Sequence, residues 1–402
     1  MSEQMRNVIG NPVEGNDFFN RPKEVGRLER ELANAANLLL VAPRRVGKTS
    51  LVLRILERAR AGGKKAVSLN VEGCSDELGF AEQLVLELER QGLHPDILKR
   101  VSLVFQSCRK SLSGAKVGAG GLDVALGDGA DPDLGTLKKA LESIFRKIDE
   151  GDADLLIAID EMPELLLAMG KEEEGAIRVG RFLHWLRSLR QTHRHRIRWI
   201  FLGSIGLDSF VDDRDLRKTI NDLTTLSLDA LEPEEADRFL EILGIGNGLP
   251  LLPDVRTAII QRVGWPLPHH LQLMFHAMRD AEVKAADVEA VGNAFAELTK
   301  PQNSSQFDTW RQRLNDQFSL EDAKAAKALL RHLCQHPEGR TRAQIFDALM
   351  AKTPAADSDA MEERLAKLLP VLQRDGYLLE KEGRYAFRSF LLREYWFRRE
   401  VK

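Results

Sequence analysis

The sequence is poor in cysteine, in net charge and in long apolar runs, and each shortage excludes a class of protein. Its 402 residues include only three cysteines, an odd and widely spaced set without metal-ligand spacing. A disulfide framework is thereby disfavoured, and a reducing compartment is indicated. We expect Cys74, Cys108 and Cys334 to be structural thiols.

Membrane insertion and general attraction to polyanions are disfavoured as well. The longest apolar runs, such as residues 38–42 and 155–159, are far too short to span a bilayer. Residues 1–10 are polar and carry no apolar segment of a signal peptide. The net charge of −3 creates no overall field toward nucleic acid or anionic lipid, so such binding would need a local patch. We expect a cytoplasmic protein with no membrane partner.

The remaining composition is that of an ordinary globular protein long enough for two or three domains. Apolar residues make up 43% of the chain and charged residues 30%, which allows a sizeable buried core. Residues 38–41 predict a buried strand, residues 49–61 have helical spacing, and residues 66–71 predict the next strand. This order predicts an α/β fold with a parallel sheet covered on both faces.

Between the first strand and its helix lies a loop whose residue types suit a polyphosphate. The segment runs through Ala42, Pro43, Arg44, Arg45, Val46, Gly47, Lys48, Thr49 and Ser50. Gly47 lets the backbone curl close to phosphates, Lys48 reaches the β and γ oxygens, and Thr49 can hold magnesium. Backbone N–H groups at the start of the helix add the positive end of its dipole. The loop therefore predicts a site for ATP and Mg²⁺.

One residue of this loop departs from the usual pattern, and two leave alternatives open. Ala42 stands where the pattern expects a glycine, and alanine lacks easy access to positive φ. One of Arg44 and Arg45 contacts a phosphate or an acidic neighbour, or both face solvent. The strand before, the helix after and the ordered Gly-Lys-Thr outweigh the missing glycine.

A second group of polar residues follows a later apolar run. Asp160 and Glu161 come directly after the predicted strand at residues 155–159. Because ligands of open α/β sheets bind at the carboxyl edge, we expect Asp160 to orient magnesium and Glu161 to polarise the attacking water. Ser204 follows the next strand and is either a turn residue or a hydrogen-bonding partner of the γ-phosphate. Glu161, Lys48 and Ser204 are the catalytic candidates.

The rest of the chain divides into an insert, a helical region and a small C-terminal module. Residues 75–147 are predicted to form an insert with a glycine-rich hairpin at 117–126, and helices fill most of residues 234–298. Beyond a linker at 301–305, three helices and a hairpin around Gly383 have the layout of a winged helix. The three helices are predicted at residues 320–336, 341–352 and 359–374.

Several motifs taken together resemble the archaeal-type ATPase family, a STAND/AAA+ branch of the P-loop NTPases related to the origin-recognition initiators. They stand at residues 42–50, 160–161, 203–207 and 264–266. The resemblance implies that Arg21 lies near the adenine base and that Ser204 takes the sensor position. It also implies that Trp265 and Pro266 close over the nucleotide from a helical lid.

The same resemblance implies an architecture and a function. The expected parts are a P-loop NTPase core at residues 1–230, a helical lid at 231–300 and a winged-helix domain at 306–402. We expect an ATPase of low turnover, a switch that couples the nucleotide state to the winged helix and through it to a protein partner or a second copy. An alternative is a DNA-binding ATPase in replication, repair or defence against mobile DNA. A third hypothesis has nucleotide bound only to stabilise the fold.

The charges of the C-terminal module do not decide whether this module binds DNA. The third predicted helix opens with Asp359, Glu362 and Glu363, which would repel phosphates. The tail at residues 384–402 interleaves arginines with aromatic residues. Such a tail either binds a nucleic-acid backbone or forms an amphipathic helix packed on the lid.

Overall fold

The computed structural model describes residues 5–19, 21–93, 134–171, 174–203, 207–212, 214–303, 305–352 and 357–401. The chain separates into two compact units. The first covers Arg21–Val41 and Lys48–Ser227, and the second covers Met1–Asn20, Ala42–Gly47 and Leu228–Lys402. The predicted hairpin at 117–126, Cys108 and Ser204 lie outside the described residues.

The first unit is built on a five-stranded parallel sheet in the order β2-β3-β4-β1-β5. Its strands are β1 (Asn37–Val41), β2 (Lys65–Asn70), β3 (Leu155–Asp160), β4 (Ile197–Gly203) and β5 (Leu223–Ser227). Strand β4 lies between β1 and β3. Since all strands run parallel, the end of β1 that enters the loop and the end of β3 that carries Asp160 share one edge of the sheet.

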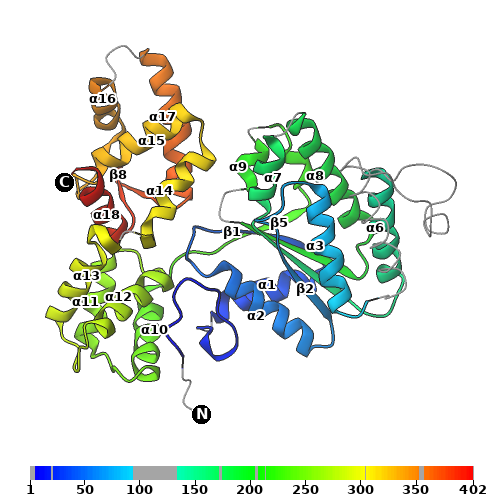
Figure 1. Ribbon diagram of the computed structural model, residues 1–402, viewed down its shortest axis with the longest axis horizontal. Coiled ribbons are helices and arrows are strands. Elements are labelled where there is room, and N and C mark those ends of the chain that lie inside the picture. Colours follow the sequence, from blue (N-terminus) through cyan, green and yellow to red (C-terminus); the bar gives the residue numbers. More distant parts are fainter. Residues whose placement is uncertain are drawn as a thin grey trace. The chain divides into compact units, whose positions relative to one another are not determined.

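Both faces of this sheet are apolar, so helices cover both (Figure 1). One layer holds α1 (Pro22–Ala33) and α2 (Lys48–Ala61); the other holds α3 (Glu77–Arg90), α6 (Leu134–Asp149), α7 (Met162–Gly170) and α8 (Gly175–Thr192). Alternate residues of β3, Leu155, Ile157 and Ile159, share a buried cluster with the second layer. Helices α3 and α6, predicted as parts of an insert, therefore belong to the main core. A short α9 (Leu207–Asp212) follows β4.

The second unit begins with the helices that were expected to form a lid. They are α10 (Pro233–Gly246), α11 (Pro253–Val263), α12 (Pro268–Asp280) and α13 (Val288–Leu298). Three of the four begin with proline, whose fixed φ and missing N–H suit the first helical position. Helix α11 ends at Gly264, which has a φ of +73°. A Cβ on Gly264 would stand 2.7 Å from the Phe390 ring, so both the backbone and the packing require glycine.

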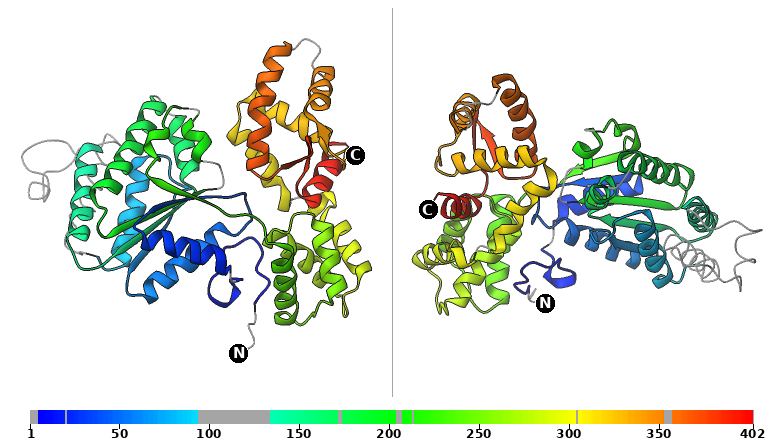
Figure 2. Two further views of the ribbon diagram at one scale, coloured as in Figure 1. Left: turned by 180° about the vertical axis from the view of Figure 1, so that it is seen from behind. Right: turned by 45° about the horizontal axis from the view of Figure 1, so that its top comes forward.

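The C-terminal part of this unit is a winged helix, as predicted (Figure 2). Its elements are α15 (Leu320–Leu333), β6 (Arg340–Thr341), α16 (Arg342–Lys352), α17 (Ser358–Arg374), β7 (Leu378–Lys381) and β8 (Arg384–Phe387). The strands pair antiparallel in the order β6-β8-β7. The prediction of a P-loop core, a helical lid and a winged helix is therefore confirmed as a fold.

Two further helices complete the unit. Helix α14 (Ser305–Gln317) follows the predicted linker and was not expected, because only Phe307, Trp310 and Leu314 supply its apolar stripe. Helix α18 (Phe390–Glu400) forms from the basic-aromatic tail and buries Tyr395 and Trp396. None of the helices in the described ranges has both the length and the apolar character needed to cross a membrane.

Helix α12 and the start of α18 meet at a buried histidine. His270 is 0% exposed, and its Nδ1 lies 3.3 Å from the Ser389 hydroxyl. Burial, together with the charge of Arg45, lowers the pKa of His270 from 6.5 to about 4. The neighbouring His269 is also buried with a lowered pKa. No group of three or more metal-binding side chains occurs among the described residues.

His270 makes the stability of this unit dependent on pH. Since its pKa is lower in the folded state, its contribution is complete above pH 6.5 and is lost as the pH falls toward 4. The loss should amount to about 3 kcal/mol. Urea unfolding followed by tryptophan fluorescence should show it, and His270→Gln should reduce the slope to the part that His269 contributes. His276→Gln, an exposed change on the same helix, should leave the slope as in the wild type. Equal slopes in all three proteins would refute the assignment.

Candidate functional site

The loop after β1 has the backbone conformation that phosphate binding needs. It joins Val41, the last residue of β1, to Lys48, the first residue of α2. Gly47 has a φ of +95° and Arg45 a φ of +65°. No heavy atom among the described residues stands within 4 Å of the place where a Cβ on Gly47 would lie. The backbone at Gly47 is therefore open to a close approach by an anion.

The alanine at position 42 does not disturb this loop. Among the described residues with positive φ, the loop contributes Arg45 and Gly47 but not Ala42. Ala42 is buried, so the position needs a small side chain but not the conformational freedom of glycine. The departure seen in the sequence therefore carries no backbone strain.

The first turn of α2 offers an environment for negative charge. Lys48, Thr49 and Ser50 form this turn, where backbone N–H groups and the helix dipole are positive. Lys48 is only 7% exposed, and no acidic residue lies in this turn, all of which is described. The Lys48 charge acts on the Asp160 carboxyl, and the helix dipole adds a positive field that also attracts anions. The turn is therefore suited to a phosphate.

Asp160 lies next to this turn although its strand is not a neighbour of β1. The Thr49 hydroxyl donates a hydrogen bond of 2.6 Å to Oδ2 of Asp160, and the Glu161 backbone N–H donates one of 2.9 Å to Oδ1. Asp160 is 7% exposed, and this burial raises the pKa of its carboxyl, against the lowering effects of Thr49 and of the Lys48 charge. The carboxylate is therefore held in a place where a cation would favour its charged form.

Glu161 occupies an unusual backbone position directly after β3. Its φ of +57° and ψ of +33° place it in the left-handed region, just before α7. This conformation is unfavourable for a non-glycine residue, and residues that adopt it concentrate at functional sites. Glu161 is half-buried at the carboxyl edge of the sheet, in the residue next to Asp160. The position suits a group that acts on a bound ligand.

The oxygen ligands at this edge suit magnesium, which keeps several non-protein ligands, better than a metal whose ligands all come from the protein. Thr49 and Asp160 present a hydroxyl and a carboxylate at 2.6 Å from each other. Within the described ranges, no cluster of three or more His, Cys, Asp or Glu side chains could enclose an ion. Magnesium binds through one or two carboxylates and keeps waters and phosphate oxygens as its other ligands. The donor set is therefore compatible with a magnesium–nucleotide complex.

Trp265 and Pro266 lie in the second unit beside one residue of the loop. A Cβ on Gly376 would stand 2.4 Å from Trp265 Cη2 and 3.1 Å from Pro43 Cβ. Gly376 has a φ of +86°, so glycine is required here for its conformation as well. The Leu231 N–H donates to the Pro266 carbonyl at 3.2 Å, which ties this motif to the segment before α10. Within this unit, Pro43, Trp265 and Gly376 thus pack together.

Sequence reasoning missed the residues that hold Trp265. Its indole N–H donates to Asp229 Oδ1 at 3.2 Å, and the Arg388 guanidinium lies 4.3 Å from its ring centroid. Arg388 also donates to Asp229 Oδ2 at 2.5 Å. Although burial acts to raise the pKa of Asp229, hydrogen bonds from Ala230 and Arg388 lower it overall. No local motif marks Asp229 and Arg388, which are 159 residues apart in the chain.

Arg21 and Ser204 are the remaining residues that were predicted to contact the nucleotide. Arg21 belongs to the first unit, is 3% exposed, and lies 3.5 Å from Glu24 at the start of α1. Ser204 lies outside the described residues.

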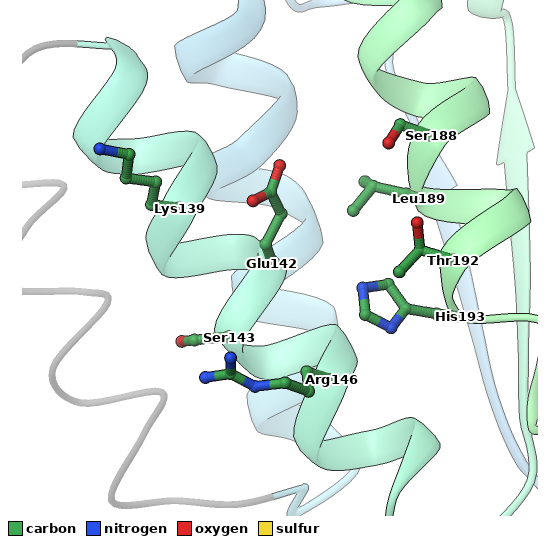
Figure 3. Close-up of a pocket in the computed structure, with 8 residues that line it drawn as sticks. All are labelled: Lys139, Glu142, Ser143, Arg146, Ser188, Leu189, Thr192 and His193. Atoms are coloured by element: carbon green, nitrogen blue, oxygen red, sulfur yellow. The ribbon is translucent and has the colours of Figure 1, made fainter.

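A polar hollow of about 400 Å³ lies elsewhere in the first unit (Figure 3). Helix α6 contributes Lys139, Glu142, Ser143 and Arg146, and α8 with its C-terminal end contributes Ser188, Leu189, Thr192 and His193. Both helices end here before turning into the start of a strand, so the hollow is near the amino edge of the sheet. Its polar groups serve the structure: Glu142 accepts from the Trp185 indole at 3.1 Å, and His193 stacks on Phe145. The loop after β1 and Asp160 lie at the opposite, carboxyl edge, where ligands of open α/β sheets bind.

Comparison with known proteins supports the fold. No family profile and no curated protein matches the sequence. Among solved structures, a Walker-type ATPase of Pyrococcus abyssi is 16% identical with a TM-score of 0.64, covering 97% of this chain and 99% of that one. The ORC2 protein of Aeropyrum pernix, in ADPNP–ADP complexes, is 13% identical with a TM-score of 0.56, covering 96% of this chain and 93% of that one. The chain therefore has the fold of this Walker-type ATPase and of the ORC2 protein.

Proposed function

We propose that the protein binds ATP with Mg²⁺ at the loop of residues 42–50 and hydrolyses it slowly. The observation that carries this proposal is the 2.6 Å hydrogen bond between Thr49 and Asp160, one residue from the buried Lys48. It brings a hydroxyl, a carboxylate and an ammonium together at the N-terminus of α2. These groups can hold a magnesium ion and the β and γ phosphates.

Each residue would have a distinct task. Backbone N–H groups of the loop and Lys48 bind phosphate oxygens, while Thr49 and Asp160 hold magnesium directly or through water. Bound magnesium neutralises phosphate charge. Glu161 orients and polarises the attacking water. Arg21 near the base, Ser204 near the γ-phosphate, and Trp265 with Pro266 above the nucleotide complete the proposed site.

We further propose that this site works as a switch for the winged helix. Residues 42–47 belong to the same compact unit as the lid and the winged helix, and Pro43 packs near Trp265 and Gly376. Gly376 lies two residues beyond the end of α17. A loop that changes conformation with its nucleotide would therefore act on packing that involves both the lid and the winged helix. A ligand shifts an equilibrium only through such differential contacts. The readout would be a protein partner or a second copy of this chain.

Hydrogen exchange tests the switch. Adding ATP with Mg²⁺ to the Glu161→Gln protein should change amide protection in the loop and also in residues 228–300 and 357–401 relative to the ADP state. The physical reason is that only contacts that differ between the two states transmit the nucleotide's presence. Protection confined to the loop and α2, with identical exchange elsewhere in ATP and ADP, would leave a nucleotide-binding protein without a switch.

The DNA-binding alternative is less well supported by the winged helix. Three cations on or beside α17 are engaged within the domain: Arg342 of α16 pairs with Glu362 at 2.6 Å, and Arg364 and Lys367 of α17 pair with Asp322 at 2.9 and 3.0 Å. In α18, Arg398 pairs with Glu394 at 2.7 Å, and Arg399 contacts Asp308. These pairs, and the burial of the α18 aromatic residues, favour the packing interpretation of the tail. DNA affinity that is high at low salt and falls steeply as salt rises would restore the alternative.

A further inference from the structure

The N-terminal segment of the second unit is fastened to the lid. This segment, the strap of residues 5–19, runs beside α10 (Figures 1 and 2). Met5 is 1% exposed, and its carbonyl accepts a hydrogen bond of 2.9 Å from Nδ2 of Asn247, the residue after α10. At the other end of the strap, the Phe19 ring meets the Phe239 ring of α10 edge to face, with centroids 5.3 Å apart. The strap is therefore held to the lid at both of its ends.

The contact between the strap and α10 is closest at a glycine. A Cβ on Gly246, the last residue of α10, would stand 2.7 Å from the Met5 carbonyl oxygen and 3.0 Å from the Met5 nitrogen. Gly246 is not among the described glycines with positive φ, so packing alone requires a glycine here. Gly292 in α13 has no heavy atom of the described residues within 4 Å of the place of its Cβ. An alanine at Gly246 would thus push the strap away from the lid, whereas an alanine at Gly292 fits.

The loop of the nucleotide site is joined to the strap by Arg45. Its Nη1 donates a hydrogen bond of 3.3 Å to the Gly10 carbonyl. The φ of Arg45 is +65°, a conformation that a residue with a side chain keeps only where its surroundings hold it. Arg45 and the strap both belong to the second unit. The contact with Gly10 therefore helps to hold the loop two residues before Gly47.

The guanidinium of Arg45 also lies close to the lid. Burial, and after it the charge of Arg44, lowers the pKa of Arg45, so this side chain is partly withdrawn from water. His269 and His270 stand in the first turn of α12, and the Arg45 charge adds to the effect of burial in lowering the pKa of both. Arg45 is therefore placed where the loop, the strap and the lid come together within one unit.

We propose that Arg45 is a positioning residue for nucleotide binding, which holds the loop in its phosphate-binding conformation by joining it to the strap. Its guanidinium contacts the protein backbone and acts through the loop, not as a ligand of the phosphates. A loop that is already held in the bound conformation loses less conformational entropy when the nucleotide arrives. This inference rests on the proposed ATP site, and it makes the affinity of that site depend on a strap that is fastened to the lid.

The test compares Mg·ATP affinity, measured by calorimetry, in matched variants. Arg45→Met and Gly246→Ala should each weaken binding by about 3- to 10-fold, the effect of one lost hydrogen bond. Gly292→Ala makes the same change in a helix without a clash and should bind as the wild type does. Hydrogen exchange without nucleotide should be faster in residues 5–19 of Gly246→Ala. The double variant should bind no more weakly than the weaker single variant, because both changes break one connection.

The outcomes separate this inference from the proposed function. If Arg45→Met binds Mg·ATP as tightly as the wild type while Lys48→Ala does not, the ATP site stands and the positioning role is overturned. Losses that multiply in the double variant would also overturn it, since Arg45 would then contact the nucleotide independently of the strap.

Gly246→Ala tests the strap separately. Faster exchange in residues 5–19 with full Mg·ATP affinity would reduce the strap to a structural element, and unchanged exchange would contradict its fastening to α10. A wild-type protein that binds no nucleotide would overturn the proposed function, and this inference with it, although the strap would still be released in Gly246→Ala.

Discussion

Lys48→Ala is expected to lower the affinity for Mg·ATP by at least about 100-fold, the largest effect on binding of any single change in this protein. Lys48 is buried in the first turn of α2, where its ammonium meets the positive end of the helix dipole. A bound polyphosphate accepts hydrogen bonds from the ammonium and interacts favourably with the helix dipole. Removing the ammonium leaves a phosphate without its charge-assisted hydrogen bonds in a poorly solvated place.

Calorimetry with Mg·ATP measures this effect, and Lys64→Ala provides the control. Lys64 is exposed and forms a loose pair with Asp154 at 3.6 Å. It stands next to the start of β2, at the amino edge of the sheet. Its replacement should leave affinity unchanged. Undiminished ATP affinity in Lys48→Ala would refute the assignment of the phosphate site.

Glu161→Gln is expected to preserve nucleotide binding and to reduce turnover by about 100- to 10,000-fold, the range that general-base groups contribute. The substitution keeps the size of the side chain and its left-handed backbone at φ +57°, but removes the carboxylate that polarises water. Binding should persist because Thr49, Asp160 and Lys48 are untouched. Phosphate release under saturating Mg·ATP measures turnover, and calorimetry measures binding.

Glu164→Gln is the matched control for this prediction. Glu164 lies in the first turn of α7, three residues beyond Glu161, and its backbone N–H donates to the Glu161 carbonyl at 3.0 Å. Its replacement changes the same charge near the same edge, so a general electrostatic effect would slow both variants alike. Equal turnover in Glu161→Gln and the wild type would remove the catalytic role from Glu161.

The elements of the fold were largely predictable because most of them carry a local signal. The strand at residues 38–41, the glycine-containing loop and the helix after it are contiguous, and the helix predicted at residues 49–61 is observed as α2, Lys48–Ala61. Helix α14 was missed because its surface is polar and three apolar residues define its buried face. The three-part division of the chain stays a prediction; the compact units instead place residues 42–47 with the lid and winged helix.

The sequence by itself determined chemistry that is local in the chain. After one strand come a glycine at positive φ, Lys48, Thr49 and the start of a helix, and after a later buried strand come two acidic residues. Only the tertiary structure decided which distant groups meet, because insertion of β4 between β1 and β3 sets the distance that Thr49 and Asp160 bridge. It also gave Ala42 a backbone conformation that needs no glycine, and it joined Arg45 to Gly10, 35 residues earlier in the chain. Burial and pairing depend on neighbours far away in the chain, and no local pattern records them.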